Sequence, residues 1–345
     1  MIADWGGLPV LVTGGASFIG SHLVRALAER GARVRVADDF SSGSAAALAP
    51  LVSTGLVELV ECDLRDPGVA GAAVDGMDVV FHLAADHGGR GYVETHQAGP
   101  ASNIRLDATV FHECMRAGVG KVVFASSGCV YPNHLQQNPS EELYLSEELV
   151  GPPYDPDHMY GWAKLVGELT LQAMHRELGL NAASCRYFVV YGPGANEGHG
   201  LIAMIARAFL RSDPFEIWGT GEQIRNWTYI DDIVDGTILA AERIDDGTAV
   251  NLGTMERTRV IDAARQILDL TGHRAEIRTL PDMPTGPLNR VADNGLATRL
   301  LGWEPHVAFC EGLERTIEWY FETKDRDEVR RVVDGGGLVE RLRPA

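Results

Sequence analysis

The sequence predicts an α/β fold: a doubly wound parallel sheet with helices on both faces, joined to a smaller, discontinuous α/β lobe. Two observations lead to this prediction. Apolar segments of strand length alternate with amphipathic segments of helix length from the first residues onward. After Tyr191 the alternation breaks at a loop rich in Gly and Pro. We therefore expect the main sheet to come chiefly from the part of the chain before Tyr191.

The first predicted unit is a strand, a turn and a helix. Leu8–Thr13 is an apolar run that suits a buried strand, and the glycine-rich segment GGASFIG follows it. Ile19, Leu23 and Leu27 then fall on one face of an amphipathic helix. Gly31 is well placed to end that helix.

The same pattern continues along the chain. Further strands are predicted at Arg33–Ala37, Val57–Val60, Val79–Leu83, Lys121–Ser126 and Ala182–Val190. Helices are predicted at Asn103–Ala117 and Met159–Leu178. Later segments predict helices at Leu201–Leu210, Asp231–Ala241 and Arg259–Leu270, and strands at Phe215–Trp218 and Thr248–Leu252. The last of these strands could return to the main sheet.

These segments suggest a division of the chain. Residues 1–187 and 228–258 are predicted to form the sheet domain, and residues 188–227 and 259–323 the smaller lobe. Residues 324–345 form a charged tail that contains GGG. We expect this tail to be a helix with a loose end or to be partly disordered.

Composition excludes several classes of protein. The formal charge of −18 argues against non-specific nucleic-acid binding. No apolar run approaches the roughly 20 residues of a membrane helix, and the N-terminus lacks the pattern of a signal peptide. The five cysteines form no CxxC pair and no HExxH motif occurs, so neither disulfides nor a metal site is predicted. A reducing cytoplasm is the expected location.

The turn after the first strand is a candidate phosphate site. Gly14 and Gly20 let the backbone turn tightly, so that amides at the helix N-terminus can face a pyrophosphate. Ser17 stands where GxGxxG has its middle glycine, and the alternative interpretation is merely a tight strand–helix turn. Its position between a strand and an amphipathic helix favours dinucleotide binding.

Asp38 ends the second strand, about 20 residues further on, where a ribose-binding acid is expected. A carboxylate there repels a 2′-phosphate, which favours NAD over NADP; the alternative is the polar start of a loop. Asp63, after the third strand, could contact the adenine. The residues predicted to bind NAD are Gly14, Ser17, Phe18, Ile19, Gly20, Asp38, Asp63, Leu64, Ala84, Tyr160 and Lys164.

Tyr160 and Lys164 lie one helical turn apart and form a candidate proton-transfer pair. We expect the charge of Lys164 to lower the pKa of Tyr160 from about 10. Ser127 follows a predicted strand, at the sheet edge where ligands bind in such folds, and would hydrogen-bond the substrate oxygen. Alone, such a pair is usually a solvated helix face.

Six segments together resemble the extended short-chain dehydrogenase/reductases that act on nucleotide sugars. They are TGGASFIG, HLAA (His82–Ala85), ASSGCVYP (Ala125–Pro132), YGWAK (Tyr160–Lys164), RYFVVYGPG (Arg186–Gly194) and IWGTGEQIRNWTYIDD (Ile217–Asp232). Within this superfamily the chain most resembles the GDP-mannose 3,5-epimerases. That closer similarity lies in LAADHGGRGYVETHQ (Leu83–Gln97), SSGCVYP, RVADN (Arg290–Asn294) and LLGW (Leu300–Trp303).

The resemblance implies a Rossmann fold, NAD, a nucleotide-sugar substrate and a homodimer formed through the helices at Asn103–Ala117 and Met159–Leu178. It also implies a reaction in three stages. The hexose is oxidised at carbon 4 with Tyr160 as base, protons at carbons 3 or 5 are exchanged, and the ketone is reduced again. Alternatives on the same fold are 4-epimerisation, 4,6-dehydration or decarboxylation of a UDP- or dTDP-sugar. A non-catalytic NAD-sensing protein is a remote alternative.

Two residues are candidates for the proton exchange at carbon. Cys129 occupies the loop position that faces carbon 5 in similar enzymes, and a thiol with a pKa of about 8.5 can take and give a proton. The family's second group is a lysine, but here a count back from FEIWG places His199 at that position. Their alternatives are a buried apolar cysteine and an exposed loop histidine. The predicted catalytic residues are Ser127, Cys129, Tyr160, Lys164 and His199.

The resemblance also implies substrate contacts. Arg225 and Arg290 match positions that hold the pyrophosphate, although surface ion pairing is their alternative. His87, Gly88 and Arg90 belong to a glycine loop expected to lie over the sugar. Val189 departs from the family, which usually has an asparagine there that contacts the nucleotide sugar, so the substrate or its pose is in question.

Overall fold

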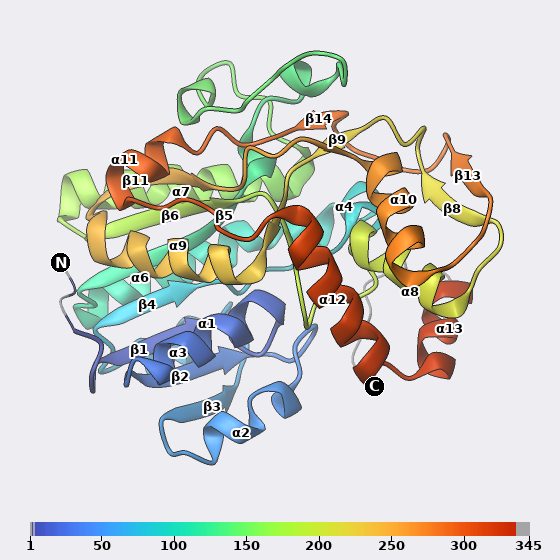
Figure 1. Ribbon diagram of the computed structural model, residues 1–345. Helices are drawn as coiled ribbons and strands as arrows, with labels where there is room; N and C mark the ends of the chain where they lie inside the picture. Colours follow the sequence, from blue (N-terminus) through green and yellow to red (C-terminus); the bar gives the residue numbers. More distant parts are fainter. Residues whose placement is uncertain (1, 3, 336–345) are drawn as a thin grey trace.

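The computed structural model describes residue 2 and residues 4–335, and its centre is a seven-stranded parallel sheet (Figure 1). The strand order is β11-β6-β5-β4-β1-β2-β3, and every neighbouring pair is parallel. The strands are β1 (Pro9–Thr13), β2 (Arg33–Asp38), β3 (Val57–Glu61), β4 (Val79–His82), β5 (Lys121–Ser127), β6 (Ala182–Tyr187) and β11 (Asp246–Leu252). This order reverses direction at β1 and β4, as in a doubly wound fold.

Both faces of the sheet are covered, which explains why its strands are continuous apolar runs. Along β1, Val10 and Val12 pack into one apolar cluster, whereas Leu11 packs into a second cluster on the other side. The first cluster includes residues of α1 (Phe18–Glu29) and α9 (Ile230–Arg243). The second includes residues of α3 (Pro67–Val74), α6 (Asn103–Ala117) and α7 (His158–Leu178). The predicted α/β fold with a doubly wound sheet is confirmed.

A second group of elements lies to the right of the sheet in Figure 1. It includes α8 (Gly200–Leu210), α10 (Val260–Thr271), α12 (Phe309–Thr323) and α13 (Arg326–Asp334). Three small sheets accompany them, with orders β10-β7, β12-β9-β14 and β13-β8. Their strands are β7 (Val189–Tyr191), β8 (Phe215–Trp218), β9 (Ile224–Arg225), β10 (Trp227–Tyr229), β12 (Thr258–Arg259), β13 (Ile277–Leu280) and β14 (Asn289–Arg290). The remaining α-helices are α2 (Ala49–Val52), α4 (Arg90–Thr95), α5 (Ala98–Ala101) and α11 (Gly295–Leu301).

Most predicted elements are present, with one instructive error. The predicted strand Ala182–Val190 is two strands: β6 ends at Tyr187, and β7 begins at Val189 and pairs with β10 away from the main sheet. The predicted return of Thr248–Leu252 to the main sheet is confirmed, because β11 pairs with β6. Part of the predicted tail forms α13, and residues 336–345 lie outside the described residues. The residue limits of the two domains remain a prediction.

Candidate active site

Two adjoining cavities lie at the carboxyl ends of the sheet strands. The larger has a volume of about 400 Å³ and extends from the start of α1 and the ends of β5 and β6 to α8 and β8. The smaller, of about 170 Å³, lies at the ends of β1, β2 and β3. Ser17, Leu83 and His87 line both cavities, so the two form a continuous site. This is the edge of a parallel sheet where ligands bind.

The turn between β1 and α1 is shaped for a close approach of backbone groups. Gly14 has a φ of +67°, and a Cβ atom there would lie 2.8 Å from the backbone nitrogen of Ala84. A Cβ atom on Gly20 would lie 2.2 Å from the carbonyl oxygen of Gly14. The Ser17 hydroxyl donates to that same carbonyl at 2.6 Å. The glycines therefore hold the N-terminus of α1 against the strand and leave the dinucleotide cradle open.

The predicted cofactor residues divide between the two cavities. Gly14, Ser17, Asp38, Asp63, Leu64 and Ala84 line the smaller one. Ser17, Phe18, Ile19, Tyr160 and Lys164 line the larger one. Gly20 lines neither cavity and acts through its packing against Gly14.

The two predicted nucleoside-binding carboxylates differ in their local contacts. Asp38 is buried and accepts from the backbone nitrogens of Ala16 and Phe40, each at 2.9 Å, which fixes its carboxylate beside the turn. Asp63 is exposed and is held by the Arg65 guanidinium at 2.8 Å. Hydrogen bonds from Arg65 lower the pKa of Asp63. Asp38 is thus the more buried of the two, and backbone groups hold its carboxylate.

Tyr160 and Lys164 lie in the first two turns of α7 and both line the larger cavity. The Lys164 side chain is buried, with its Nζ 5.8 Å from the centroid of the Tyr160 ring and 4.6 Å from that of Phe124. Ser127 is the last residue of β5 and lines the same cavity. The structure therefore brings together the three predicted residues of the hydride-transfer site.

The sequence predicted that the pKa of Tyr160 is lowered, and this prediction is wrong for the structure. Burial raises the pKa of the phenol, negative charge on Cys129 or Asp107 raises it further, and a hydrogen bond with Ser127 only partly offsets this. Burial also lowers the pKa of Lys164, because an ammonium is costly to desolvate. Spacing places the two groups near each other, but it does not reveal how far each of them is buried.

Cys129 belongs to a polar cluster that the sequence predicted only in part. Its backbone nitrogen donates to the Ser127 hydroxyl at 3.1 Å, and Arg290 Nη1 donates to its Sγ at 3.2 Å. Arg290 Nη2 also donates to Asp157 Oδ2 at 3.1 Å, and Arg90 Nη1 donates to the same oxygen at 2.8 Å. One buried carboxylate thus holds two arginines beside the thiol. Surface ion pairing was the alternative interpretation of Arg290, and it does not apply, because Arg290 is buried.

Arg225 adds a third guanidinium on the same side of the cavity. Its Nη1 and Nη2 donate to the carbonyl oxygens of Ile224 and Thr285, both at 2.7 Å, and among the described residues it has no carboxylate as a direct ion-pair partner. Burial lowers the pKa of Arg225 to about 9, and the positive charges of Arg290 and Arg90 contribute to the same shift. An anion bound between these side chains would relieve their mutual repulsion.

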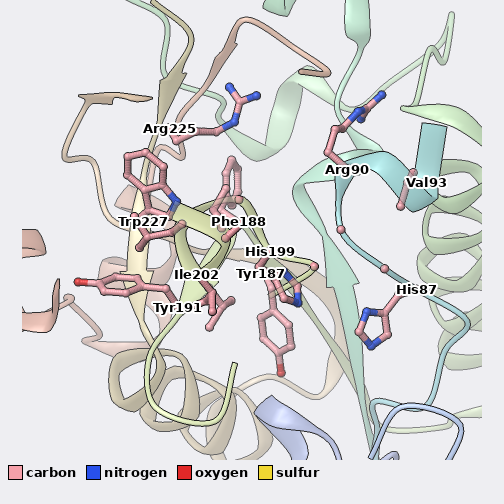
Figure 2. Close-up of a pocket in the computed structure, with 18 of the residues that line it drawn as sticks. His87, Arg90, Val93, Tyr187, Phe188, Tyr191, His199, Ile202, Arg225 and Trp227 are labelled. Atoms are coloured by element: carbon pink, nitrogen blue, oxygen red, sulfur yellow. The ribbon is translucent and has the colours of Figure 1, made fainter. Parts of the chain in front are cut away.

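His199 precedes α8 and lines the larger cavity, as do His87 and Gly88. In the view of Figure 2, Arg90 and Arg225 lie toward the top of the cavity, and His87 and His199 lie below them. Burial lowers the pKa of His199, so its imidazole is neutral at neutral pH and has a lone pair that can accept a proton.

The loops that carry these histidines touch each other at two glycines. A Cβ atom on Gly89 would lie 1.6 Å from the carbonyl oxygen of Gly198, so only glycine fits there without movement. The adjacent Glu197 is buried and accepts from the Tyr320 hydroxyl at 2.7 Å and from Lys324 Nζ at 2.9 Å. The His199 loop is therefore anchored both to the His87 loop and to the end of α12.

Two residues of this site were not predicted from the sequence. Asp157 precedes α7 and lacks any motif of its own, and only its contacts with Arg90 and Arg290 reveal its place. Arg207 is buried in the cavity lining and donates to Ala203 O of its own helix at 3.1 Å. A lone arginine in the otherwise apolar segment GLIAMIARAFL was the signal for it. Val189, where the family has asparagine, also lines the cavity.

Residues 10–253 match the family model described as NAD dependent epimerase/dehydratase family. The chain is 29% identical over 334 residues to a GDP-mannose 3,5-epimerase of Arabidopsis thaliana, covering 94% of this chain and 85% of the relative. It is 30% identical over 334 residues to a UDP-N-acetyl-alpha-D-glucosaminuronate decarboxylase of Bacillus cytotoxicus, covering 91% and 98%. A Thermus thermophilus UDP-glucose 4-epimerase solved with NAD is 27% identical, with a TM-score of 0.80 over 92% of this chain and all of that one (100%).

Two other kinds of feature are absent from the described residues. No described helix is both long and apolar enough to cross a membrane. Within the same part of the chain, no group of three or more His, Cys, Asp or Glu side chains could hold a metal ion.

Proposed function

The chain belongs to the NAD-dependent epimerase/dehydratase family, and on that premise we propose that it epimerises a nucleotide sugar at carbon 5, or at carbons 3 and 5, by way of a transient 4-keto sugar. GDP-mannose or a related sugar is the proposed substrate. The observation that carries this proposal is that Tyr160, Cys129 and the cluster of arginines line one cavity. A hydride-transfer site, a proton-transferring thiol and an anion site thus lie within reach of one ligand.

NAD fits the residues of the cradle. The open backbone at Gly14 and Gly20 suits the pyrophosphate, and the carboxylate of Asp38 suits a ribose hydroxyl. NAD held there would supply a group that reversibly accepts a hydride. Tyr160 takes the proton of the carbon 4 hydroxyl as a phenolate, which the positive charge of Lys164 favours against the effect of burial. Ser127 hydrogen-bonds the same oxygen.

The remaining groups act on the sugar and its phosphates. Arg225 and Arg290 hold the diphosphate, supported by Arg90, because these three arginines carry more positive charge than Asp157 and Glu94 neutralise. A ketone at carbon 4 acidifies the neighbouring C–H bonds. Cys129 then takes or returns a proton on one face, and the neutral His199 does so on the other.

The competing reactions share the oxidation step and differ in the fate of the 4-keto sugar. A 4-epimerase needs no acid or base at carbon 5, which leaves Cys129 without a task. A 4,6-dehydratase usually needs acidic partners beside the serine, where this chain has Gly128 and Cys129. The relatives include a 3,5-epimerase, a decarboxylase and a 4-epimerase, so similarity to them does not decide between these reactions. Val189 replaces an asparagine that contacts the nucleotide sugar in the family, so the identity of the sugar is not fixed by the family resemblance.

Turnover in heavy water tests the proposal. The protein is incubated with GDP-mannose and, separately, with UDP-glucose, and the products are analysed by proton NMR and mass spectrometry. Deuterium at carbon 5 or at carbons 3 and 5 supports the proposal, whereas turnover without deuterium uptake points to 4-epimerisation. Cys129→Ala should abolish exchange while NAD stays bound. Cys310→Ala, at an exposed cysteine outside the cavity lining, is the matched control.

Two wider features belong to the same proposal. A homodimer through α6 and α7 is consistent with the exposed Trp162 and Leu169, which lie two turns apart on α7. A cytoplasmic location is consistent with the five free cysteines.

A further inference from the structure

A chain of buried polar groups runs behind the cavity from β1 to α6. Thr13 Oγ1 lies 2.7 Å from His82 Nδ1, and His82 Nε2 lies 3.0 Å from Asp107 Oδ1. All three side chains are almost completely excluded from solvent. The backbone nitrogens of Leu83 and Ala84 both donate to Thr13 Oγ1 at 3.1 Å.

These contacts determine where the protons of the chain lie. Because two N–H groups already donate to Thr13 Oγ1, its own proton is directed at His82 Nδ1, which must then be an acceptor. The ring proton of His82 is therefore on Nε2 and is donated to Asp107 Oδ1. Asp107 thus receives a neutral donor on one oxygen, and its negative charge is not compensated by the histidine.

The second oxygen of Asp107 points toward α7. It is buried without a hydrogen-bond partner among the described residues, and a Cβ atom on Gly167 would lie 3.3 Å from it. Gly167 lies three residues after Lys164 on α7. A buried carboxylate of this kind is unfavourable unless a positive charge is near. Asp107 raises the pKa of Lys164 against the lowering effect of burial.

The other charged groups around Lys164 have partners of their own or act only when ionised. On α7, Glu168 binds Arg186 of β6 at 2.8 Å and also accepts from Ser126 of β5. Tyr160 on the same helix and Cys129 after β5 are neutral unless they lose a proton. His82 of β4 is hydrogen-bonded to Thr13 and Asp107. Asp107 of α6 is therefore the carboxylate that serves Lys164.

We propose that Asp107 is a positioning residue for Lys164: its carboxylate, fixed by His82 and Thr13, keeps the Lys164 side chain charged beside Tyr160. This proposal depends on the proposed function only for the catalytic task of Lys164. The electrostatic relation between the two side chains can be measured without any turnover.

The chain contains only three lysines, Lys121, Lys164 and Lys324, so their titration can be followed directly. The protein is labelled with ¹³C at the lysine ε-carbons, the signals are assigned with Lys121→Arg and Lys324→Arg, and each is titrated by NMR. In Asp107→Asn the midpoint of Lys164 should fall by about one pH unit or more, the range expected for loss of a nearby opposite charge. An unchanged midpoint would overturn the proposal.

Two controls keep the result interpretable. Glu113→Gln makes the same chemical change on α6, at a buried carboxylate that pairs with Arg116, and should leave Lys164 unchanged. Asp107→Ser removes the same charge with a smaller side chain and replaces Asp107→Asn if that variant does not fold. A neutral Lys164 at pH 7 in the unaltered protein would overturn the proposal without any variant.

The pH profile of turnover is the catalytic readout. Loss of the Asp107 charge favours the ionised phenol of Tyr160 and disfavours the ammonium of Lys164, so both limbs of the profile should move to lower pH. A purely structural role would lower the rate without moving the limbs. If the NMR midpoint falls but the limbs stay, the electrostatic relation holds and the catalytic use of Lys164 fails.

Discussion

Replacing Asp157 with asparagine tests the charge balance of the anion site. Asp157 Oδ2 accepts from Arg90 and Arg290, and the carboxylate is 2% exposed. In Asp157→Asn the side chain keeps its shape but no longer offsets either guanidinium. Arg290 would then lie in a largely buried site beside Arg225 without its carboxylate, whereas Arg90 would keep its pairing with Glu94.

The size of the effect follows from burial. Removing one partner of a buried ion pair typically costs about 3–5 kcal/mol, because the other charge stays desolvated. Unfolding entropy near 60 °C is about 2.1 cal/mol/K per residue, or about 0.7 kcal/mol/K for a chain of 345 residues. Each kcal/mol therefore lowers the Tm by about 1.4 °C, and the variant should melt about 4–7 °C below the unaltered protein.

Calorimetry with and without GDP measures both parts of the prediction. The diphosphate of GDP would replace the missing carboxylate, so the rise in Tm caused by saturating GDP should be larger in Asp157→Asn than in the unaltered protein. Asp155→Asn, at an exposed carboxylate two residues earlier that pairs with His134, is the control and should change stability by less than about 1 kcal/mol. A Tm within about 1 °C of the unaltered protein would refute the reasoning.

The effect should also depend on pH in a defined direction. Burial alone would raise the pKa of Asp157, but the charges of Arg290 and Arg90 hold it below its ordinary value. A carboxylate with a lowered pKa stabilises the fold above its unfolded pKa of about 3.9, and that contribution is lost as the pH falls through the lower, folded value. The gap in stability between the two proteins should thus be constant above about pH 5 and should narrow below about pH 4.

Three further changes test other parts of the site. Gly89→Ala places a methyl group against Gly198 and should lower kcat/KM about tenfold or more, with about 1–3 kcal/mol of strain in the folded protein. Gly151→Ala is the control, because an added Cβ atom there meets nothing within 4 Å. Equal kinetics for the two variants would exclude a role for the loop contact. His199→Ala should slow deuterium exchange at carbon by roughly 10²–10⁴-fold and spare hydride transfer, so a normal exchange rate would remove it from the mechanism. Tyr160→Phe should abolish the transient reduction of bound nicotinamide, seen by near-ultraviolet absorbance, and unaltered turnover would remove the central step.

The fold and the centre of the site were predictable because strand ends in a parallel sheet meet at one edge. Gly14, Asp38 and Ser127 each end or follow an apolar run, so their meeting at the carboxyl edge follows from the topology. The strand break at Phe188 was not predictable, because no Gly or Pro marks the change of sheet within Ala182–Val190.

Residues whose role depends on long-range contacts could not be predicted from the sequence either. Asp157 precedes a helix and Asp107 lies within one, and neither stands in a motif; their importance comes from partners 133 residues later and 25 residues earlier. The pKa of Tyr160 was wrong for a related reason. Helical spacing gives the distance to Lys164, whereas desolvation depends on every element that packs around the pair.

The attachment of Glu197 to Tyr320 and Lys324 has a consequence for evolution and engineering of this enzyme. A truncation or fusion that disturbs the end of α12 would release the segment bearing His199, although more than 120 residues separate them in sequence. Activity would then decline before global unfolding is detectable. Variation near the C-terminus should accordingly be judged by product stereochemistry as well as by thermal stability.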